Sequence, residues 1–536
     1  MSTASYLPAA SRARRRPTVR RLAAWLASRA VDPRTGVWLV IGFALIHAVL
    51  WTLILVKLKA AQDVHMDVAE AYAWGQRFLL GYGKHPPLSG WIAGVWFRIF
   101  PVTNWSAYAL AMTTVSFALV ACWLIALRVV DRRRAFFMVV MLALYPIFNF
   151  KGFKYNADLV QLVPLPLLVL AYLNAFEKRN VKSGLWLGFA SALALMTKYW
   201  VVTVIGAVGL AALIHPQRLA FLRSPAPWVA IGTMIVAMLP HLVWLEEVSF
   251  TPFTYAGDVY SLSSRALNVQ LVIGYIGHNL ALLAAPVLLG LLALSLGSST
   301  WRPAAALARI WSRGPNPGVN LAQALNVWII QAIVAIGPPL GALAFTVYIK
   351  TDWGIPLFFL VPLALVAIPR VRVPLMALFT ITAIWLVITI VMLFAAPSIA
   401  RQEMASSHNG ASTYFARSEL ARELTGTWHS KFHSRWAVVA ARTDISEPMT
   451  FYSPDHPAAI TPNEVSSGLI SLDDAKRLGF IGVCDTTDPI FLKPCEAWMA
   501  EHARDAEPLV MTTQRFFGGH PGPLTVWKVY LVPPAK

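Results

Sequence analysis

Two carboxylates, Asp67 and Glu70, stand three residues apart in a segment rich in alanine and aromatic residues. On a helix this spacing puts both side chains on one face. Neighbouring carboxylates raise each other's pKa, so one of them can serve as a general base; both are therefore catalytic candidates. The alternative is that Asp67 caps the helix and Glu70 is its capping-box partner. Both interpretations predict a helix that begins close to Asp67.

A lysine and a histidine come directly before two prolines, in Lys84-His85-Pro86-Pro87. Cationic side chains held beside a rigid turn can bind a phosphate group, because ammonium and imidazolium groups pair with phosphate oxygens. The alternative is ordinary interfacial charge that meets lipid head groups. We therefore take Lys84 and His85 as candidates for phosphate binding.

Further candidates lie in short polar segments between apolar runs. The additional phosphate-binding candidates are Lys151, Lys154 and Lys198. The substrate-binding candidates are Tyr72, Tyr155, Asn156, Asp158 and Tyr255. An acidic residue such as Asp158 at the end of an apolar run is unexpected unless it is paired, functional or a helix cap. This concentration of positive charge suits a phosphate or diphosphate head group at a membrane surface.

Membrane helices must position these residues, because the composition is too apolar for a soluble chain. The 536 residues are 57% hydrophobic and 13% charged, whereas soluble domains carry about 25% charged residues. The 21 tryptophans suit a bilayer interface. The net charge of +19 lies mostly between apolar runs, which indicates membrane topology and argues against a nucleic-acid partner.

The apolar runs predict about 11 transmembrane helices, since a span needs about 20 apolar residues. The predicted spans are 37–57, 105–130, 135–150, 157–176, 184–197, 200–214, 226–245, 268–297, 322–348, 353–368 and 373–396. The fold class is therefore an α-helical polytopic membrane protein followed by a small soluble α/β domain. A GT-C-like arrangement is implied only by the resemblance described below.

Positive charges assign the two sides of the membrane. Residues 1–36 form a basic cytoplasmic segment, and the first apolar run is predicted to be an uncleaved signal anchor. The other cytoplasmic clusters contain Arg128, Arg132–Arg134, Lys178, Arg179, Lys182, Arg218, Arg223, Arg302, Arg309, Arg313, Arg370 and Arg372. With an odd number of spans, loop 58–104 and residues 397–536 face the periplasm of a bacterial inner membrane.

The loop at 58–104 is predicted to contain two amphipathic helices that lie at the interface. The outer loop 246–265 is long enough to form a lid. In the soluble domain, 397–536, strands are expected at 436–440 and 524–531 and helices at 418–428 and 472–478. Cys484 and Cys495 are either a disulfide in an oxidising compartment or two buried thiols.

Four elements together resemble glycosyltransferase family 39 of the GT-C class. They are Asp67-x-x-Glu70, the Lys84-His85-Pro86-Pro87-Leu element, Asn156-x-Asp158 and Thr197-Lys198-Tyr199. The bacterial branch of this family includes aminoarabinose and galacturonosyl transferases, and protein mannosyltransferases are more distant relatives. The resemblance is strongest over residues 60–230, and the later spans match only in layout.

The resemblance implies a function and roles for single residues. Such enzymes transfer a sugar, with inversion, from a polyprenyl-phosphate-linked donor to a lipid or protein hydroxyl on the outer face. Asp67 matches the proposed general base, Lys84 a lysine that contacts the donor phosphate, and Asp158 a second acid in the cavity. Many members have adjacent Asp and Glu where this chain has Asp67-Val68, which puts a metal role in doubt. No cofactor is required, although a divalent cation stays open.

Three alternatives remain open from the sequence. The acceptor can be a protein hydroxyl rather than lipid A, lipopolysaccharide core or another glycolipid. A lipid or solute transporter would suit the many spans, but no duplicated halves are visible and the acids lie away from the midplane. A scaffold whose soluble tail binds a partner would use Lys84 and His85 as an interface anchor.

Overall fold

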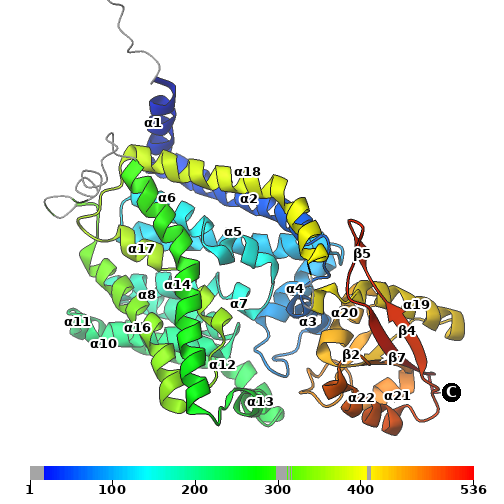
Figure 1. Ribbon diagram of the computed structural model, residues 1–536. Coiled ribbons are helices and arrows are strands. Elements are labelled where there is room, and N and C mark those ends of the chain that lie inside the picture. Colours follow the sequence, from blue (N-terminus) through cyan, green and yellow to red (C-terminus); the bar gives the residue numbers. More distant parts are fainter. Residues whose placement is uncertain (1–16, 297–310, 312–313, 315–316, 407–411, 536) are drawn as a thin grey trace, which may run out of the picture.

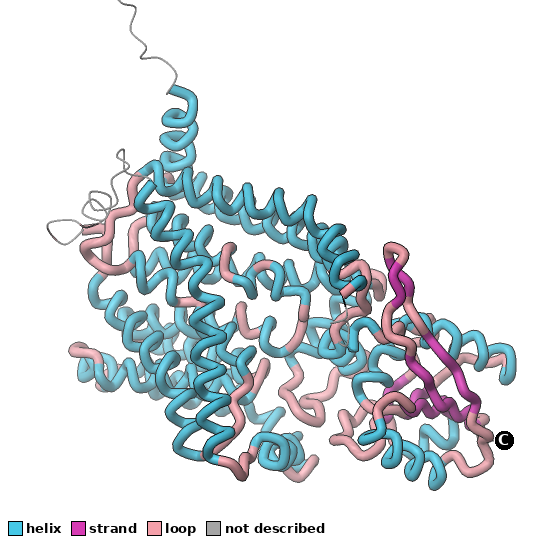
Figure 2. Tube along the Cα trace, viewed as in Figure 1, coloured by secondary structure: helices cyan, strands magenta, loops and turns pink. Residues whose placement is uncertain are grey.

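The computed structural model describes most of the chain, namely residues 17–296, 311, 314, 317–406 and 412–535. Figure 1 shows a large helical part and a smaller C-terminal part, described over residues 412–535, beside it. Among the described residues, all strands belong to the C-terminal part (Figure 2). The predicted class of a helical membrane protein with a small α/β tail is confirmed.

Seven of the described helices are long and apolar enough to cross a membrane. They are α2 (Pro33–Leu58), α5 (Asn104–Val129), the stretch Ala157–Lys178, α12 (Pro225–Glu247), α14 (Arg265–Leu296), α16 (Leu321–Phe345) and α18 (Leu375–Ala405). The stretch at 157–178 contains α7 (Ala157–Val160) and α8 (Pro164–Lys178). The predicted boundary at residue 397 lies inside α18, which continues through Pro397.

The other four predicted spans form shorter or interrupted helices. They are α6 (Arg132–Ala143), α9 (Val181–Leu195), η3 (Tyr199–Val201) with α10 (Val202–Ile214), and η4 (Thr351–Phe358) with α17 (Val361–Val366). Proline and polar residues explain the interruptions, because Pro146 follows α6, Lys198 separates α9 from η3, and Pro362 opens α17. This part also contains α1 (Pro17–Val31), η1 (Pro146–Phe148), η2 (Phe150–Phe153), α11 (Arg218–Leu222) and α13 (Thr251–Tyr260). The predicted basic residues before residue 17, and Arg302, Arg309 and Arg313, lie outside the described residues.

Local sequence explains where several helices begin. Asp32 accepts hydrogen bonds from two backbone N–H groups of the first turn of α2, and Pro33 takes the first helical position. Asp131, Asn180 and Asn320 cap α6, α9 and α16 in the same way. Helices α9 and α12 pack closely because Gly184 has no side chain: a Cβ there would lie 2.6 Å from the Ala226 carbonyl oxygen.

Helices α3 (Met66–Gly75) and α4 (Leu88–Ile99) occupy the first predicted outer loop. Every residue of α3 from Val68 to Gly75 is buried. The prediction of an amphipathic helix at the membrane interface is therefore wrong for α3. The reason is that α20 (Thr443–Tyr452) of the C-terminal part packs on it, with the Phe451 ring 5.5 Å from the Tyr72 ring.

The C-terminal part is built on a five-stranded sheet of order β2-β1-β3-β7-β4. The strands are β1 (Val438–Ala440), β2 (Ala458–Ile460), β3 (Phe480–Asp485), β4 (Leu509–Thr513) and β7 (Thr525–Val532). The first three are mutually parallel, and β7 runs antiparallel to β3 and β4. The other elements are α19 (Arg417–Phe432), α20, α21 (Leu472–Leu478), α22 (Pro489–His502), and the short hairpin β5 (Phe516–Phe517) and β6 (His520–Pro521). The strands and helices expected from the sequence are confirmed, and a Cys484–Cys495 disulfide links β3 to α22.

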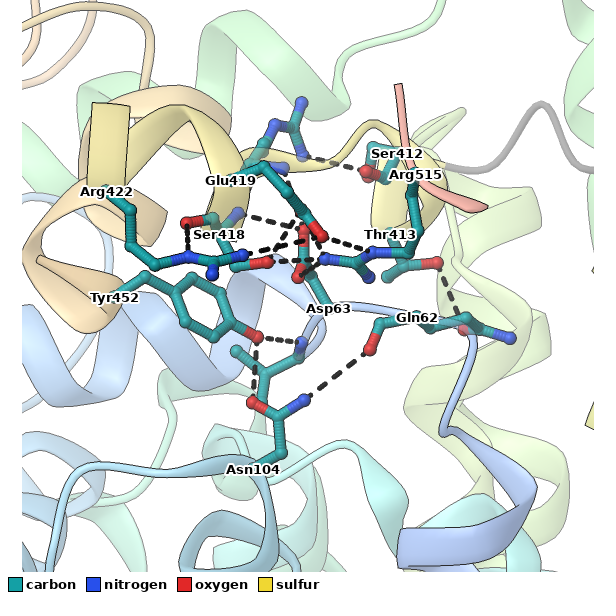
Figure 3. A network of polar contacts seen from close by, with 12 residues as sticks. Gln62, Asp63, Asn104, Ser412, Thr413, Ser418, Glu419, Arg422, Tyr452 and Arg515 are labelled. Atoms are coloured by element: carbon teal, nitrogen blue, oxygen red, sulfur yellow. Dashed lines mark hydrogen bonds and ion pairs between the residues drawn. The ribbon is translucent and has the colours of Figure 1, made fainter. Parts of the chain in front are cut away.

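A polar network joins the C-terminal part to the helical part (Figure 3). Arg515 makes ion pairs with Asp63 at 2.5 Å and with Glu419 at 2.7 Å. Tyr452 donates a hydrogen bond of 2.9 Å to Asn104 at the start of α5. Asp63 precedes α3 and is only 4% exposed, so this network fixes the C-terminal part directly against the segment that carries the candidate carboxylates.

Candidate functional site

A cavity of about 300 Å³ brings together side chains from segments far apart in the sequence. Nine of the residues predicted for the site line it: Asp67, Glu70, Lys84, His85, Lys154, Asn156, Asp158, Lys198 and Tyr255. Helix α3 contributes the first two, the turn before α4 the next two, the loop before α7 Lys154 and Asn156, and α7 itself Asp158. The cavity thus lies where α3, the start of α7, the α9–α10 turn and α13 meet.

Asp67 lies in the first turn of α3, and its carboxylate is held by two partners. The Asn156 amide donates a hydrogen bond of 2.9 Å and the Lys154 ammonium lies 3.2 Å away, while the His65 ring stands beside it with Nδ1 at 3.5 Å. Burial disfavours the charged carboxylate, but Lys154, His65 and Asn156 outweigh it and hold the pKa of Asp67 below its ordinary value. Asp67 is therefore ionised at neutral pH.

The capping interpretation of Asp67 and Glu70 is wrong. The residue that caps α3 is His65, whose ring nitrogen accepts a hydrogen bond of 3.2 Å from the Asp67 backbone N–H. Glu70 instead forms an ion pair with Lys84. Both acids are thus free of the helix backbone, and both line the cavity.

Glu70 and Lys84 form the second charged pair of the cavity. The side chains are 8% and 25% exposed. Burial raises the pKa of Glu70 to about 7, although Lys84 opposes that shift. Burial lowers the pKa of Lys84, but Glu70 outweighs it and the net pKa is raised. The two carboxylates therefore differ, with Asp67 firmly ionised and Glu70 able to hold a proton near neutral pH.

Asp158 and Lys198 form a third pair, with 2.7 Å between carboxylate oxygen and ammonium nitrogen. The Lys198 ammonium also lies 4.7 Å from the centre of the Trp353 ring, within the range of a cation–π contact. Asp158 does not cap its helix, because Asn156 accepts the capping hydrogen bond from the Leu159 N–H. A carboxylate from α7 and an ammonium group from the turn between α9 and η3 therefore meet in the cavity wall.

His85 differs from the charged group expected from the sequence. It is half-buried in the cavity lining, and the loss of solvent around its ring, helped by Lys198 and Lys84, lowers its pKa well below the ordinary value. Its Nδ1 has no hydrogen-bond partner among the described residues. His85 is therefore neutral at physiological pH, and any contact with an anion would come from a ring N–H.

Three predicted residues lie outside the main cavity. Lys151 pairs with Asp352 at 3.5 Å in a neighbouring cavity of about 160 Å³. Tyr155 is buried and donates a hydrogen bond to the Ser89 carbonyl, and Tyr72 packs against rings of α4 and α20. Tyr72 and Tyr155 therefore make packing and hydrogen-bond contacts outside the lining of the main cavity. The two cavities share four lining residues: His65, Lys154, Asn156 and Asp158.

Several lining residues were not among the predicted site residues. Tyr260 lies at the end of α13, in the loop expected to form a lid, and Lys350 and Trp353 come from the turn before α17. Lys350 could have been found from its position in an outer turn beside Asp352. Glu447 is buried on α20, and no sequence pattern around it marks it as a site residue. It nevertheless interacts electrostatically with Glu70 and Lys84.

The charge balance of the cavity favours an anionic ligand. Four lysines line it, Lys84, Lys154, Lys198 and Lys350, against the three carboxylates described above. In the described part of the chain, no group of three or more His, Cys, Asp or Glu side chains has the spacing of a metal site. A lysine-rich pocket that also holds the ionised carboxylate of Asp67 can bind a phosphate and accept a proton.

Comparisons with known proteins agree with this geometry. Residues 84–244 match the dolichyl-phosphate-mannose-protein mannosyltransferase family. The chain is 24% identical over 252 residues to the lipid A galacturonosyltransferase RgtD of Rhizobium johnstonii, covering 45% of this chain and 49% of that protein. It is 26% identical over 202 residues to the lipopolysaccharide core galacturonosyltransferase RgtA of the same organism, covering 36% and 39%. The matches thus span about half the length of these relatives or less.

A solved structure shares the fold over nearly the whole chain. The crystal structure of ArnT from Cupriavidus metallidurans bound to undecaprenyl phosphate superposes with a TM-score of 0.50, covering 93% of this chain and 98% of that one. At 14% identity this likeness concerns the fold alone. Together with the family match over residues 84–244, it confirms the resemblance of this chain to glycosyltransferases of the GT-C class.

Proposed function

We propose that the chain transfers a sugar from a polyprenyl-phosphate-linked donor to a hydroxyl of lipid A, lipopolysaccharide core or another glycolipid, at the outer face of the bacterial inner membrane. The observation that carries this proposal is the convergence of Asp67, Lys84 and Lys198 on one cavity. The cavity combines cations for a phosphate with an ionised carboxylate for a proton.

The donor phosphate is proposed to bind among the lysines. Lys84, Lys154 and Lys198 are each paired with a carboxylate of the cavity. The donor phosphate is a diester with one negative charge and gains a second as the sugar leaves, so it competes with these carboxylates for the ammonium groups, most strongly as the bond to the sugar breaks. Phosphate binding would then loosen the ion pairs that hold the acids.

Asp67 is proposed to be the general base. When Lys154 shifts toward the phosphate, Asp67 loses the nearest cation that holds its pKa low, and its basicity rises. It then takes the proton of the acceptor hydroxyl as that oxygen attacks the anomeric carbon. The bond from that carbon to the phosphate oxygen breaks, polyprenyl phosphate leaves, and the configuration inverts. The lysines neutralise the charge that develops on the phosphate.

Two observations bear on the acceptor. The curated relatives are named for lipid A and for lipopolysaccharide core, which supports a glycolipid acceptor. The matching family is described by protein mannosyltransferases, which favours a protein hydroxyl as the second candidate. A divalent cation is not required by the proposed mechanism, because a monophosphate leaving group and several lysines share the charge.

The experiment uses the purified protein in nanodiscs, a panel of polyprenyl-phosphate sugars and a membrane glycolipid extract. We expect mass spectrometry to find a sugar-sized mass gain on a glycolipid. A gain on membrane protein alone would replace the glycolipid acceptor by a protein acceptor. A folded protein that gives no gain with either acceptor class, yet moves the donor lipid across the nanodisc or vesicle bilayer, would overturn the proposal in favour of a transporter.

A further inference from the structure

Glu447 is a buried carboxylate that belongs to the C-terminal part and lies outside the cavity lining. Its side chain is 1% exposed, and its Oε2 has no hydrogen-bond partner among the described residues. Burying a carboxylate without a partner is costly unless it is protonated or lies near a cation. The position of Glu447 therefore depends on the groups that face it.

Helix α20 directs Glu447 toward α3. Glu447 and Phe451 are four residues apart and share one face of α20. The Phe451 ring packs 5.5 Å from the Tyr72 ring and 5.8 Å from the Phe97 ring, so this face points at α3 and α4. Glu70 is buried on α3, and α20 packs along α3. Glu447 therefore lies in the interface between α20 and the helix that carries Glu70.

The charged groups that act on Glu447 agree with this placement. They are Glu70 and Asp67 of α3, Lys84 of the turn before α4, and Glu464 of the loop after β2. Glu447 in turn acts on Lys84, second only to Glu70 among the surrounding charges. One lysine is therefore flanked by two acids, one from each part of the molecule.

We propose that Glu447 is a positioning residue for the donor-phosphate site: together with Glu70 it brackets the Lys84 ammonium group, so that the C-terminal part completes the site. This inference rests on the proposed function, because it assumes that Lys84 binds the donor phosphate. It gives the C-terminal part a role in binding the donor phosphate, besides its packing against the helical part.

The position of Lys84 between two acids should make the binding of an anion depend on pH. Burial raises the pKa of Glu447 well above its ordinary value, Glu70 raises it further, and Lys84 opposes the shift. The two acids therefore retain a proton at neutral pH, which leaves the positive charge of Lys84 available to a phosphate. As the pH rises, the acids lose that proton, and the added negative charge weakens the binding of an anion.

The test measures binding of undecaprenyl phosphate to the full-length protein in nanodiscs at pH 7 and pH 9. The phosphate is already doubly charged in this range, since its second pKa is about 6. We expect Glu447→Ala to weaken binding at pH 7 by about tenfold and Glu447→Gln to restore it to within about threefold of the wild type. The wild type should bind more weakly at pH 9 than at pH 7, and Glu447→Gln should lose part of that difference. Glu423→Gln, an exposed charge change on α19, is the matched control.

The outcomes separate this inference from the proposed function. If the wild type binds and Lys84→Ala does not, but both Glu447 variants behave as the wild type at both pH values, the inference is overturned and the donor site stands. If the wild type does not bind undecaprenyl phosphate at all, the donor site and the inference fall together. If Glu447→Ala does not fold, the pH dependence of Glu447→Gln alone decides.

Discussion

At the scale of single residues, the structure places two lysines with the same predicted role in two different cavities. Lys84 and Lys151 both stand in outer segments with aromatic neighbours, and both were expected to bind phosphate. The structure puts Lys84 in the main cavity with Glu70, whereas Lys151 pairs with Asp352 in the smaller cavity next to it. Replacing each of the two lysines in turn therefore tests which cavity binds the phosphate.

Lys84→Ala should weaken the binding of undecaprenyl phosphate by about tenfold to a hundredfold, because a hydrogen bond to a charged group contributes about 1.5–3 kcal/mol. Lys151→Ala removes the same side chain from the neighbouring cavity and should change the affinity by less than about threefold. Both values come from titration of the protein in nanodiscs. Equal losses in the two variants would mean that the phosphate lies across both cavities.

What could be predicted at this scale depended on local spacing. Asp67, Glu70, Lys84 and His85 fall within one short stretch, so their types and distances suggested a site. The neutral state of His85 could not be predicted, because it follows from the loss of solvent in the folded cavity and from the charge of Lys198, which is distant in the sequence. Glu447 is separated from α3 by most of the chain, and only the packing of α20 brings it to the site.

At the scale of elements, the contact between the C-terminal part and the helical part is the feature that a single substitution should weaken most. Arg515 is 11% exposed, and its partner Asp63 is 4% exposed. Removing one member of a buried ion pair leaves a buried charge without its partner, which costs about 3–5 kcal/mol. The network in Figure 3 is therefore expected to decide whether the C-terminal part stays docked.

Arg515→Ala should lower the thermal unfolding midpoint of the purified protein by several degrees, measured by tryptophan fluorescence. The matched control is Arg422→Ala, since Arg422 also pairs with Glu419 but is 69% exposed and 3.8 Å away. It should leave the midpoint within about one degree. An unchanged midpoint in Arg515→Ala would show that apolar contacts such as Phe451 with Tyr72 hold the two parts together without this network.

Elements were predicted well where hydropathy alone determines them. All eleven apolar segments became helices, because a bilayer requires internally satisfied backbone groups. The break at Lys198 was predicted as the gap between the spans 184–197 and 200–214. The 3-10 helix η4 was not foreseen, since prolines interrupt a run that is apolar on average. The burial of α3 was not foreseen either, because its cover comes from the C-terminal part.

At the scale of the whole molecule, sidedness follows from charge. The distribution of arginine and lysine predicts that the C-terminal part and the cavity face the periplasm while the segment before α2 faces the cytoplasm. The Cys484–Cys495 disulfide suits an oxidising compartment. The only other cysteine, Cys122, is buried, so an introduced cysteine can report on sidedness.

Arg422→Cys on α19 should react with a membrane-impermeant maleimide in intact spheroplasts. Arg34→Cys at the start of α2 is also exposed and should react only after the membrane is permeabilised. The readout is the mass shift of the purified chain. The reverse pattern would put the cavity on the cytoplasmic side and would contradict the proposed donor orientation.

The central claim is that Asp67 is the base of a sugar transfer from a polyprenyl phosphate. The most direct measurement compares the wild type with Asp67→Asn, which keeps the shape of the side chain but removes its charge. Transfer to the glycolipid is followed by mass spectrometry, and undecaprenyl phosphate binding is measured in parallel. We predict that transfer falls by about 10²–10⁴-fold while undecaprenyl phosphate still binds. Near-normal transfer by Asp67→Asn would contradict the account and turn attention to Glu70 as the base.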